Sequence, residues 1–238
     1  MAGILYAIPT PLGGAAASAL PASAMDTVRS LRIFVVENAK TARAFLKDVG
    51  MPCVMQDLDI TTLEADFVPY VKKLREGQSI GLLSEAGCPA IADPGALLVE
   101  AAHKAGIRVV PLIGPSSIVL ALMASGLEGQ RFAFCGYLPR EPDQRKKKIK
   151  ELEARSRRER ETQIFIETPY RNDSMLAALL ESCARGTRLC IATDLTLSSE
   201  SVKTKPVADW RKKQQSIGKR PTVFLLLANW AGSVESSL

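Results

Sequence analysis

The sequence lacks the residues that several common catalytic mechanisms require. It contains one histidine, His103, which lies in a predicted helix, and we expect it to be a surface residue rather than a catalyst. Sites with several histidine ligands are therefore excluded. The five cysteines include no CxxC pair, so we also expect no metal site. Neither a GxGxxG motif after a strand nor a GxxxxGK[ST] loop is present, which argues against two common nucleotide-binding folds.

Other absences concern the compartment. No segment approaches the ~20 consecutive apolar residues that span a bilayer. Residues 15–25 are small and apolar, but the first basic residue of the chain is Arg29, so we do not expect a secretory signal. The cysteines are odd in number and widely spaced, which argues against a disulfide framework. We expect a cytoplasmic protein that does not bind membranes.

What is present is an alternation of apolar strands and helical patterns, with 47% hydrophobic residues overall. This order predicts an α/β fold. The 238 residues are enough for two α/β domains, which we place at 1–115 and 116–238. The expected strands are 4–8, 33–36, 79–83, 108–112, 131–137, 164–167, 189–193 and 222–228.

Three predicted strands are followed by loops rich in glycine, proline and small residues, at 9–14, 84–95 and 114–117. Loops at the carboxyl ends of strands in an open α/β sheet usually form the ligand-binding crevice. Small residues let the backbone approach a ligand closely. Ordinary turn chemistry would give the same composition. The three loops together are compatible with one shared nucleotide-like ligand.

One segment carries the positive charge of the chain. From Arg145 to Arg160, nine of sixteen residues are Arg or Lys and three are acidic, and this excess equals the formal net charge of +6. Such a helix or loop would attract phosphates. The alternative is a solvated helix with pairs such as Lys147–Glu151. Our candidates for nucleic-acid contacts are its first five cations: Arg145, Lys146, Lys147, Lys148 and Lys150.

Several segments resemble a known family. Residues 84–95, SEAGCPAIADPG, are similar to the S-D-A-G-x-P-x-I-x-D-P-G signature of the tetrapyrrole methylase-like superfamily, and within it to the ribosomal RNA small subunit methyltransferase I group. Residues 7–13 resemble that group's T-P-I-G-N opening, and 114–117 its G-P-S-A turn. Residues 135–139 resemble its G-F-L-P, and 167–171 its E-S-P-H-R. The resemblance extends over about residues 4 to 228.

This resemblance implies a class III methyltransferase fold, with two α/β domains, S-adenosylmethionine in the interdomain cleft and a homodimer. It also implies the cofactor contacts at the matching positions: Pro11, Glu85, Ala86, Gly87, Ile91, Ser116, Ser117, Leu138, Pro221 and Thr222. The expected reaction is methylation of a cytidine ribose 2′-hydroxyl in small-subunit ribosomal RNA. The expected partner is this RNA or the small ribosomal subunit that contains it.

A ribose hydroxyl is a weak nucleophile, so a nearby base or cation should help to form the alkoxide. Glu167 could accept the proton, and Arg171 could hold a phosphate through two hydrogen bonds. A structural hydrogen bond at the end of a strand would explain Glu167 equally well.

The match departs from the group at residues that face the acceptor. Residues 37–40 read ENAK instead of E-D-T-R, and residues 193–197 read TDLTL instead of R-E-L-T-K. Tyr170 stands where the group has histidine. These differences leave two alternatives open: the same fold methylating a small molecule such as a tetrapyrrole, or a paralogue that binds RNA or cofactor without catalysis.

Overall fold

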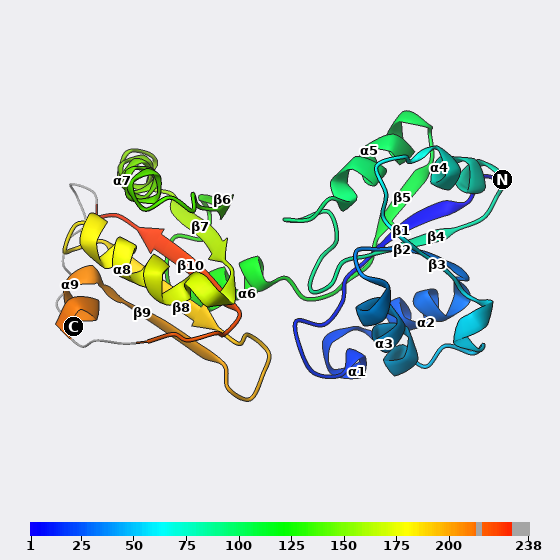
Figure 1. Cartoon of the computed structure of the whole chain (residues 1–238), viewed down its shortest axis with the longest axis horizontal. Coiled ribbons are helices and arrows are strands. Elements are labelled where there is room, and N and C mark those ends of the chain that lie inside the picture. The colour runs from blue at the N-terminus through cyan, green and yellow to red at the C-terminus, as the bar shows by residue number, and fades with distance from the viewer. Residues whose placement is uncertain (213–215, 230–238) are drawn as a thin grey trace. The chain divides into compact units, whose positions relative to one another are not determined.

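The computed structural model describes residues 1–212 and 216–229. The chain divides into two compact units, Met1–Ser116 and Ser117–Leu238, each with its own five-stranded sheet (Figure 1). This division lies one residue after the boundary predicted from the sequence.

The first unit contains a fully parallel sheet in the order β3-β2-β4-β1-β5. Because all five strands run in the same direction, the loops that follow them share one edge of the sheet. The strands are β1 (Ile4–Ile8), β2 (Ile33–Val36), β3 (Asp59–Thr62), β4 (Ile80–Leu83) and β5 (Arg108–Pro111).

Helices cover both faces of this sheet (Figure 1). One hydrophobic cluster joins the strands to α1 (Ala16–Ala19), α2 (Ala22–Ser30) and α3 (Ala39–Val49). Another joins them to α4 (Val68–Arg75) and α5 (Gly95–Lys104). Phe34 and Val36 belong to the first cluster and Val35 to the second, as expected when successive side chains of a strand point to opposite faces. A short 3₁₀ turn, η1 (Met55–Asp57), precedes β3.

The second unit has a mixed sheet in the order β6-β7-β10-β8-β9. Only β6 and β7 pair in parallel; the other neighbours are antiparallel. The strands are β6 (Phe132–Tyr137), β7 (Thr162–Glu167), β8 (Arg188–Thr193), β9 (Ser201–Pro206) and β10 (Thr222–Leu227).

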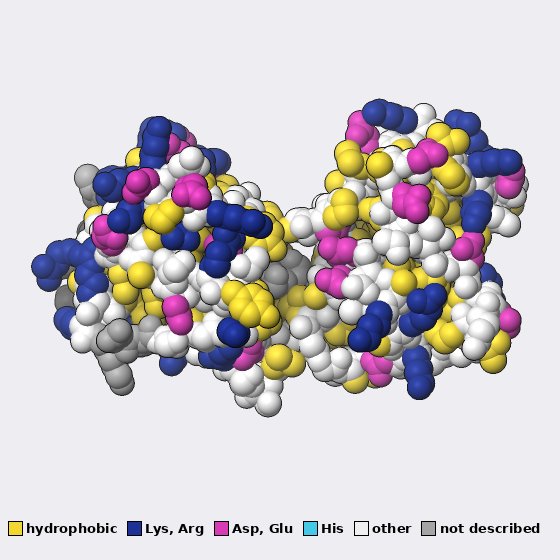
Figure 2. All heavy atoms as spheres, viewed as in Figure 1, with side chains coloured by type: hydrophobic (Ala, Val, Ile, Leu, Met, Phe, Trp, Pro, Cys, Tyr) yellow, Lys and Arg dark blue, Asp and Glu magenta, His cyan; other side chains and the backbone are white. Residues whose placement is uncertain are grey.

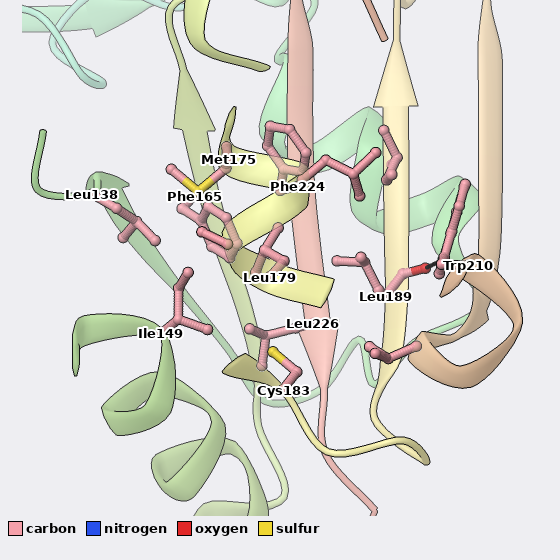
Figure 3. Packing of buried hydrophobic residues seen from close by; sticks show 14 of the residues in the cluster. Leu138, Ile149, Phe165, Met175, Leu179, Cys183, Leu189, Trp210, Phe224 and Leu226 are labelled. Carbon is pink, nitrogen blue, oxygen red and sulfur yellow. Dashed lines mark hydrogen bonds between the residues drawn. The ribbon is translucent and has the colours of Figure 1, made fainter. Parts of the chain in front are cut away.

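The core of the second unit lies between this sheet and the helices α7 (Pro142–Glu159), α8 (Asn172–Ser182) and α9 (Val207–Lys212). Figure 3 shows Ile149 of α7 and Leu179 of α8 directed toward the strands. The rings of Phe165 and Phe224 stack across β7 and β10, with centroids 5.7 Å apart. The helix α6 (Ser117–Ser125) packs against β8, β9 and β10. The 3₁₀ turn η2 (Pro169–Arg171) leads from β7 into α8.

The α/β prediction is confirmed, and every strand expected from the sequence is present with ends within three residues. The strands not foreseen are β3 and β9. The charged segment, for which a helix or a loop was open, is the helix α7. None of the helices in the described part of the chain combines the length and the apolar character that crossing a bilayer requires.

Candidate functional site

The three glycine- and proline-rich loops of the first unit follow β4, β1 and β5, which are adjacent in the sheet. Since the strands are parallel, the loops after residues 8, 83 and 111 lie along the same edge. The sequence pattern predicted a shared ligand crevice here, and the topology brings its three components together.

The loop after β4 is tied to the loop after β1. The N–H of Thr10 donates to the carbonyl of Gly87 at 2.9 Å, and the N–H of Gly87 donates back to Thr10 at 3.0 Å. The hydroxyl of Ser84 also donates to the carbonyl of Gly87, at 3.0 Å. Gly87 has φ of +80°, a left-handed conformation that glycine adopts without steric cost. Glycine at this position therefore permits the turn conformation that pairs with Thr10.

Two carboxylates fix the same loop from other positions. Oδ1 of Asp93 accepts from the N–H groups of Ala90 and Gly95, each at 2.8 Å. The N–H of Glu85 donates to Oε2 of Glu37, which follows β2, at 3.0 Å. Burial raises the pKa of Asp93 above its ordinary value, and its Oδ2 is buried without a hydrogen-bond partner within the described residues. The loop is thus organised before any ligand binds.

A pocket of about 360 Å³ opens beside these loops. Its size suits a nucleoside-like ligand. Its small side chains leave the backbone accessible, and the carboxylates of Asp48 and Glu85 suit a ligand with a cationic or hydroxyl-rich part. These residues fit S-adenosylmethionine, which carries a sulfonium, an amine and a ribose. The lining residues are Thr10, Pro11, Gly13, Gly14, Ala15, Ala44, Phe45, Asp48 and Glu85.

The predicted cofactor contacts of the first unit lie on these loops. Pro11 and Glu85 line the pocket. Ala86 and Ile91 are exposed, and Ile91 has a relative exposure of 48%. Gly87 is buried in the pairing with the loop after β1, and Ser116 is half-buried at the end of the unit.

The remaining predicted contacts lie in the second unit. Ser117 is the first residue of α6 and is half-buried. The side chain of Leu138 is buried in the hydrophobic core (Figure 3), so its backbone, not its side chain, is available for a ligand. Pro221 is exposed and precedes β10. Thr222 is buried, and its hydroxyl donates to the carbonyl of Arg220 at 2.9 Å.

Glu167, at the end of β7, is buried and paired with Arg171 of η2. Its Oε1 accepts from Nε of Arg171 at 3.0 Å, from Nη2 of the same guanidinium and from the N–H of Thr168 at 2.6 Å. Its Oε2 is buried and has no hydrogen-bond partner within the described residues. One oxygen of the carboxylate is therefore fully engaged and the other is left for a further donor.

This arrangement gives Arg171 a second role beside the phosphate contact predicted for it, which stays a prediction. Two of its three guanidinium nitrogens already bind Glu167, and Nε also contacts the hydroxyl of Thr168 at 3.3 Å. The ion pair occupies Nε and one N–H of Nη2, and the edge formed by Nη1 and the second N–H of Nη2 is left for a phosphate. The geometry makes Arg171 the residue that orients Glu167.

Beside the predicted residues Glu167 and Thr222, this edge of the second sheet carries polar residues that were not predicted as part of a site: Asn172, Thr193, Asp194 and Arg220. Thr222 lies opposite both Glu167 and Thr193 in the strand register. Asp194, the residue after β8, accepts from Nε of Arg220 at 2.6 Å. The buried amide of Asn172 donates to the carbonyls of Gly218 and Arg220, at 3.0 and 2.7 Å, and to the hydroxyl of Thr222, at 3.2 Å. For Thr193, Asp194 and Arg220 the clue in the sequence was their position at or near predicted strand ends, whereas Asn172 begins a helix and carried no such clue.

The basic helix α7 presents only part of its charge to solvent. Figure 2 shows Lys and Arg side chains gathered over it, with acidic side chains among them. Lys147 and Lys150 are exposed. Lys146 pairs with Glu181 of α8 at 2.7 Å, and Lys148, not Lys147 as expected, pairs with Glu151, at 3.5 Å.

Arg145 was wrongly predicted to face nucleic acid. It is 7% exposed, and its Nη1 donates to the hydroxyl of Ser174 at 3.2 Å. It lies on the buried stripe of α7 together with Ile149 and Leu152, and it packs against α8. His103 is exposed on α5. Residues 1–212 and 216–229 contain no group of three or more His, Cys, Asp or Glu side chains that could hold a metal ion.

Comparison with known proteins gives a consistent result. The chain is 34% identical over 226 residues to a ribosomal RNA small subunit methyltransferase I of Vibrio cholerae serotype O1, covering 94% of this chain and 76% of that protein. It is 31% identical over 227 residues to the protein of the same name from Escherichia coli O157:H7, covering 94% of this chain and 77% of that protein.

The crystal structure of the methyltransferase CobJ is similar with a TM-score of 0.64, over 96% of this chain and 95% of that chain. At 16% sequence identity this likeness shows a shared fold alone. The sequence model of the tetrapyrrole (corrin/porphyrin) methylases matches residues 5–210. With the match extending over most of both units, the chain belongs to the tetrapyrrole methylase family.

Proposed function

We propose that this protein is an S-adenosylmethionine-dependent methyltransferase that acts on ribosomal RNA of the small subunit, at the 2′-hydroxyl of a cytidine. The methylase family supports the reaction class, and the names of the relatives above support the substrate. A ribosomal substrate places the activity in the cytoplasm. We also propose a homodimer, as the family resemblance implies.

S-adenosylmethionine supplies an electrophilic methyl group on sulfur. The pocket beside the loops after β1 and β4 would hold it through Pro11, Glu85 and the backbone of residues 84–91. Pre-organised positions lower the barrier because the reacting groups need not be ordered again in each turnover. The hydrogen bonds from Thr10, Ser84 and Glu85 supply that organisation on the protein's side.

On the acceptor side, the proposal rests on a difference between the two carboxylate oxygens of Glu167. Oε1 is held by Arg171 and by the N–H of Thr168, while Oε2 is buried with its lone pairs unused by the described residues. A ribose hydroxyl that reaches Oε2 would donate its hydrogen bond there. When the hydroxyl oxygen accepts the methyl group, Oε2 would take up the proton that the hydroxyl loses. Arg171 keeps the carboxylate in position.

The test is Glu167→Gln, which keeps the shape of the side chain and removes its basicity. Labelled methyl transfer to purified small ribosomal subunits should fall by about 10²- to 10⁴-fold, the usual contribution of general base catalysis. Calorimetry should show one-site binding of S-adenosylmethionine with the wild-type affinity. The matched control is Glu181→Gln, which removes a surface carboxylate from α8 of the same unit and should leave transfer at the wild-type rate.

Turnover by Glu167→Gln at the wild-type rate would reject the role of Glu167. If wild-type protein binds S-adenosylmethionine but transfers no methyl group to small subunits, the substrate proposal is wrong, and a tetrapyrrole substrate becomes the next to test. Absence of cofactor binding by the wild-type protein would favour a non-catalytic RNA-binding role.

A further inference from the structure

An exposed aromatic ring follows the proposed proton acceptor by three residues in the chain. Tyr170 is 79% exposed, more than Phe132 at 45% or Tyr137 at 56%, the other large exposed rings of the described residues. A ring in this position adds nothing to the hydrophobic core, although aromatic side chains gain the most when they are buried. Its face is therefore available to a ligand.

The ring is presented on a firmly held turn. Tyr170 is the central residue of η2, where Pro169 restricts the backbone and the N–H of Arg171 donates to the carbonyl of Thr168 at 2.9 Å. The neighbouring Arg171 is tied to the buried Glu167. The turn that orients the carboxylate thus also fixes the position of the ring, three residues further along the chain.

One cationic group lies next to the ring. Nζ of Lys219 lies 5.0 Å from the centroid of Tyr170, within the range of a cation–π contact. The segment that carries Lys219 is itself anchored, because Asn172 binds the carbonyls of Gly218 and Arg220. One face of the ring is next to a lysine and the rest is open to solvent.

An exposed aromatic face next to a cation is the combination with which proteins hold unpaired nucleotides. The base stacks on the ring in a way that tolerates any sequence, and the cation binds a phosphate. We infer that Tyr170 and Lys219 form a stacking site for an unpaired nucleobase of the RNA substrate, next to the ribose acceptor. This inference rests on the proposed function and specifies which form of RNA the site accepts: a single-stranded or splayed nucleotide, not a continuous duplex.

The first experiment is steady-state methylation of small ribosomal subunits by Tyr170→Ala. We expect KM for the subunit to rise by about 10- to 100-fold, as for loss of one base stack, with a smaller change in kcat and an unchanged Kd for S-adenosylmethionine. Tyr170→Phe keeps the ring and should restore a KM near that of wild type. Phe132→Ala, which removes an exposed ring from the start of β6 in the same unit, is the matched control and should leave KM unchanged.

The second experiment measures binding by fluorescence anisotropy, with a labelled single-stranded RNA oligonucleotide and the same strand in a duplex. Wild type should prefer the single strand, and both Tyr170→Ala and Lys219→Ala should reduce that preference. A KM and an oligonucleotide affinity equal to wild type in Tyr170→Ala would overturn the inference. So would loss of a dimer in Tyr170→Ala, since the ring would then be a protein contact.

The two proposals fail in different ways. If wild type methylates no small subunit but Tyr170→Ala still loses single-strand affinity, the stacking site stands and the proposed reaction is wrong. If wild type methylates small subunits and Tyr170→Ala does so with the same KM, the reaction stands and the stacking site is wrong.

Discussion

Replacing Gly114 with alanine tests whether the loops after β1 and β5 are as tightly fitted as the structure shows. A Cβ built on Gly114 would lie 2.4 Å from Cβ and 2.8 Å from Cγ of Pro9, and 2.9 Å from Cδ2 of Leu20. Comfortable carbon contacts are about 3.5–4.0 Å. Leu20 can rotate away, but the ring of Pro9 is closed onto its own backbone and cannot. One of the two loops must therefore shift by about 1 Å.

Overpacking of this kind costs about 1–3 kcal/mol, so the free energy of unfolding of the first unit should fall by that amount. Urea denaturation followed by circular dichroism would measure this loss as a lower midpoint urea concentration with an unchanged m value. Because the displaced loops carry Pro11 and Ser116, the Kd for S-adenosylmethionine should rise together with the loss of stability, measurable by calorimetry.

The control is Gly129→Ala. A Cβ at Gly129 would meet no atom within 4 Å, so the same chemical change should alter stability by less than about 0.5 kcal/mol. If Gly114→Ala were as stable as Gly129→Ala and bound cofactor with wild-type affinity, the close fit of the two loops would be refuted.

Three further outcomes are expected. The double change Lys147→Ala with Lys150→Ala should weaken RNA binding. It should also reduce the slope of log K against log salt concentration by about 1.5. As the control, Arg108→Ala removes a cation from the start of β5 and should leave that slope unchanged. Burial raises the pKa of Cys183 to about 12, so N-ethylmaleimide at pH 8 should label it only in denaturant, and mass spectrometry showing labelling of the native protein would contradict this. A serine hydroxyl and a backbone N–H lower the pKa of Asp173, so its ionised form stabilises the fold above the unfolded-state pKa of about 3.9, and that stability is lost as the pH falls through the lower folded value. Asp173→Asn should therefore flatten this acid limb in urea unfolding curves, and a limb as steep as in wild type would count against the argument.

The six central strands were all predicted from their apolar runs, and the edge strands Arg108–Pro111 and Phe132–Tyr137 were predicted as well because most of their residues are apolar. The strands at 4–8 and 33–36 have the predicted limits, because a central strand of a parallel sheet needs a continuous apolar run. The missed strands, Asp59–Thr62 and Ser201–Pro206, are both edge strands with polar residues. Polar composition protects an edge from pairing with other chains, and it also hides the strand from a reading of hydrophobic runs.

Part of the candidate site could be predicted from the sequence. The loop at 84–95 was identified from its residues, but the hydrogen bond from Glu85 to Glu37 depends on which strands are neighbours, and no local pattern contains that information. The error at Arg145 was avoidable. Arg145, Ile149 and Leu152 follow helical spacing, and this periodicity marks the arginine as part of the buried face. Counting charges along the segment treated every cation as exposed.

The ion pair between Glu167 and Arg171 contributes little to the net stability of the fold. Its carboxylate is fully buried, and removing a charge from water costs more than most ion pairs recover. An apolar pair of similar volume would stabilise the end of β7 at least as well. The pair also leaves Oε2 without a donor, which a purely structural pair could avoid by sharing both oxygens with the guanidinium. A buried carboxylate with one anchored and one unused oxygen is understandable if a substrate hydroxyl completes it, and this is the physical reason to test Glu167 before any other acceptor-side residue.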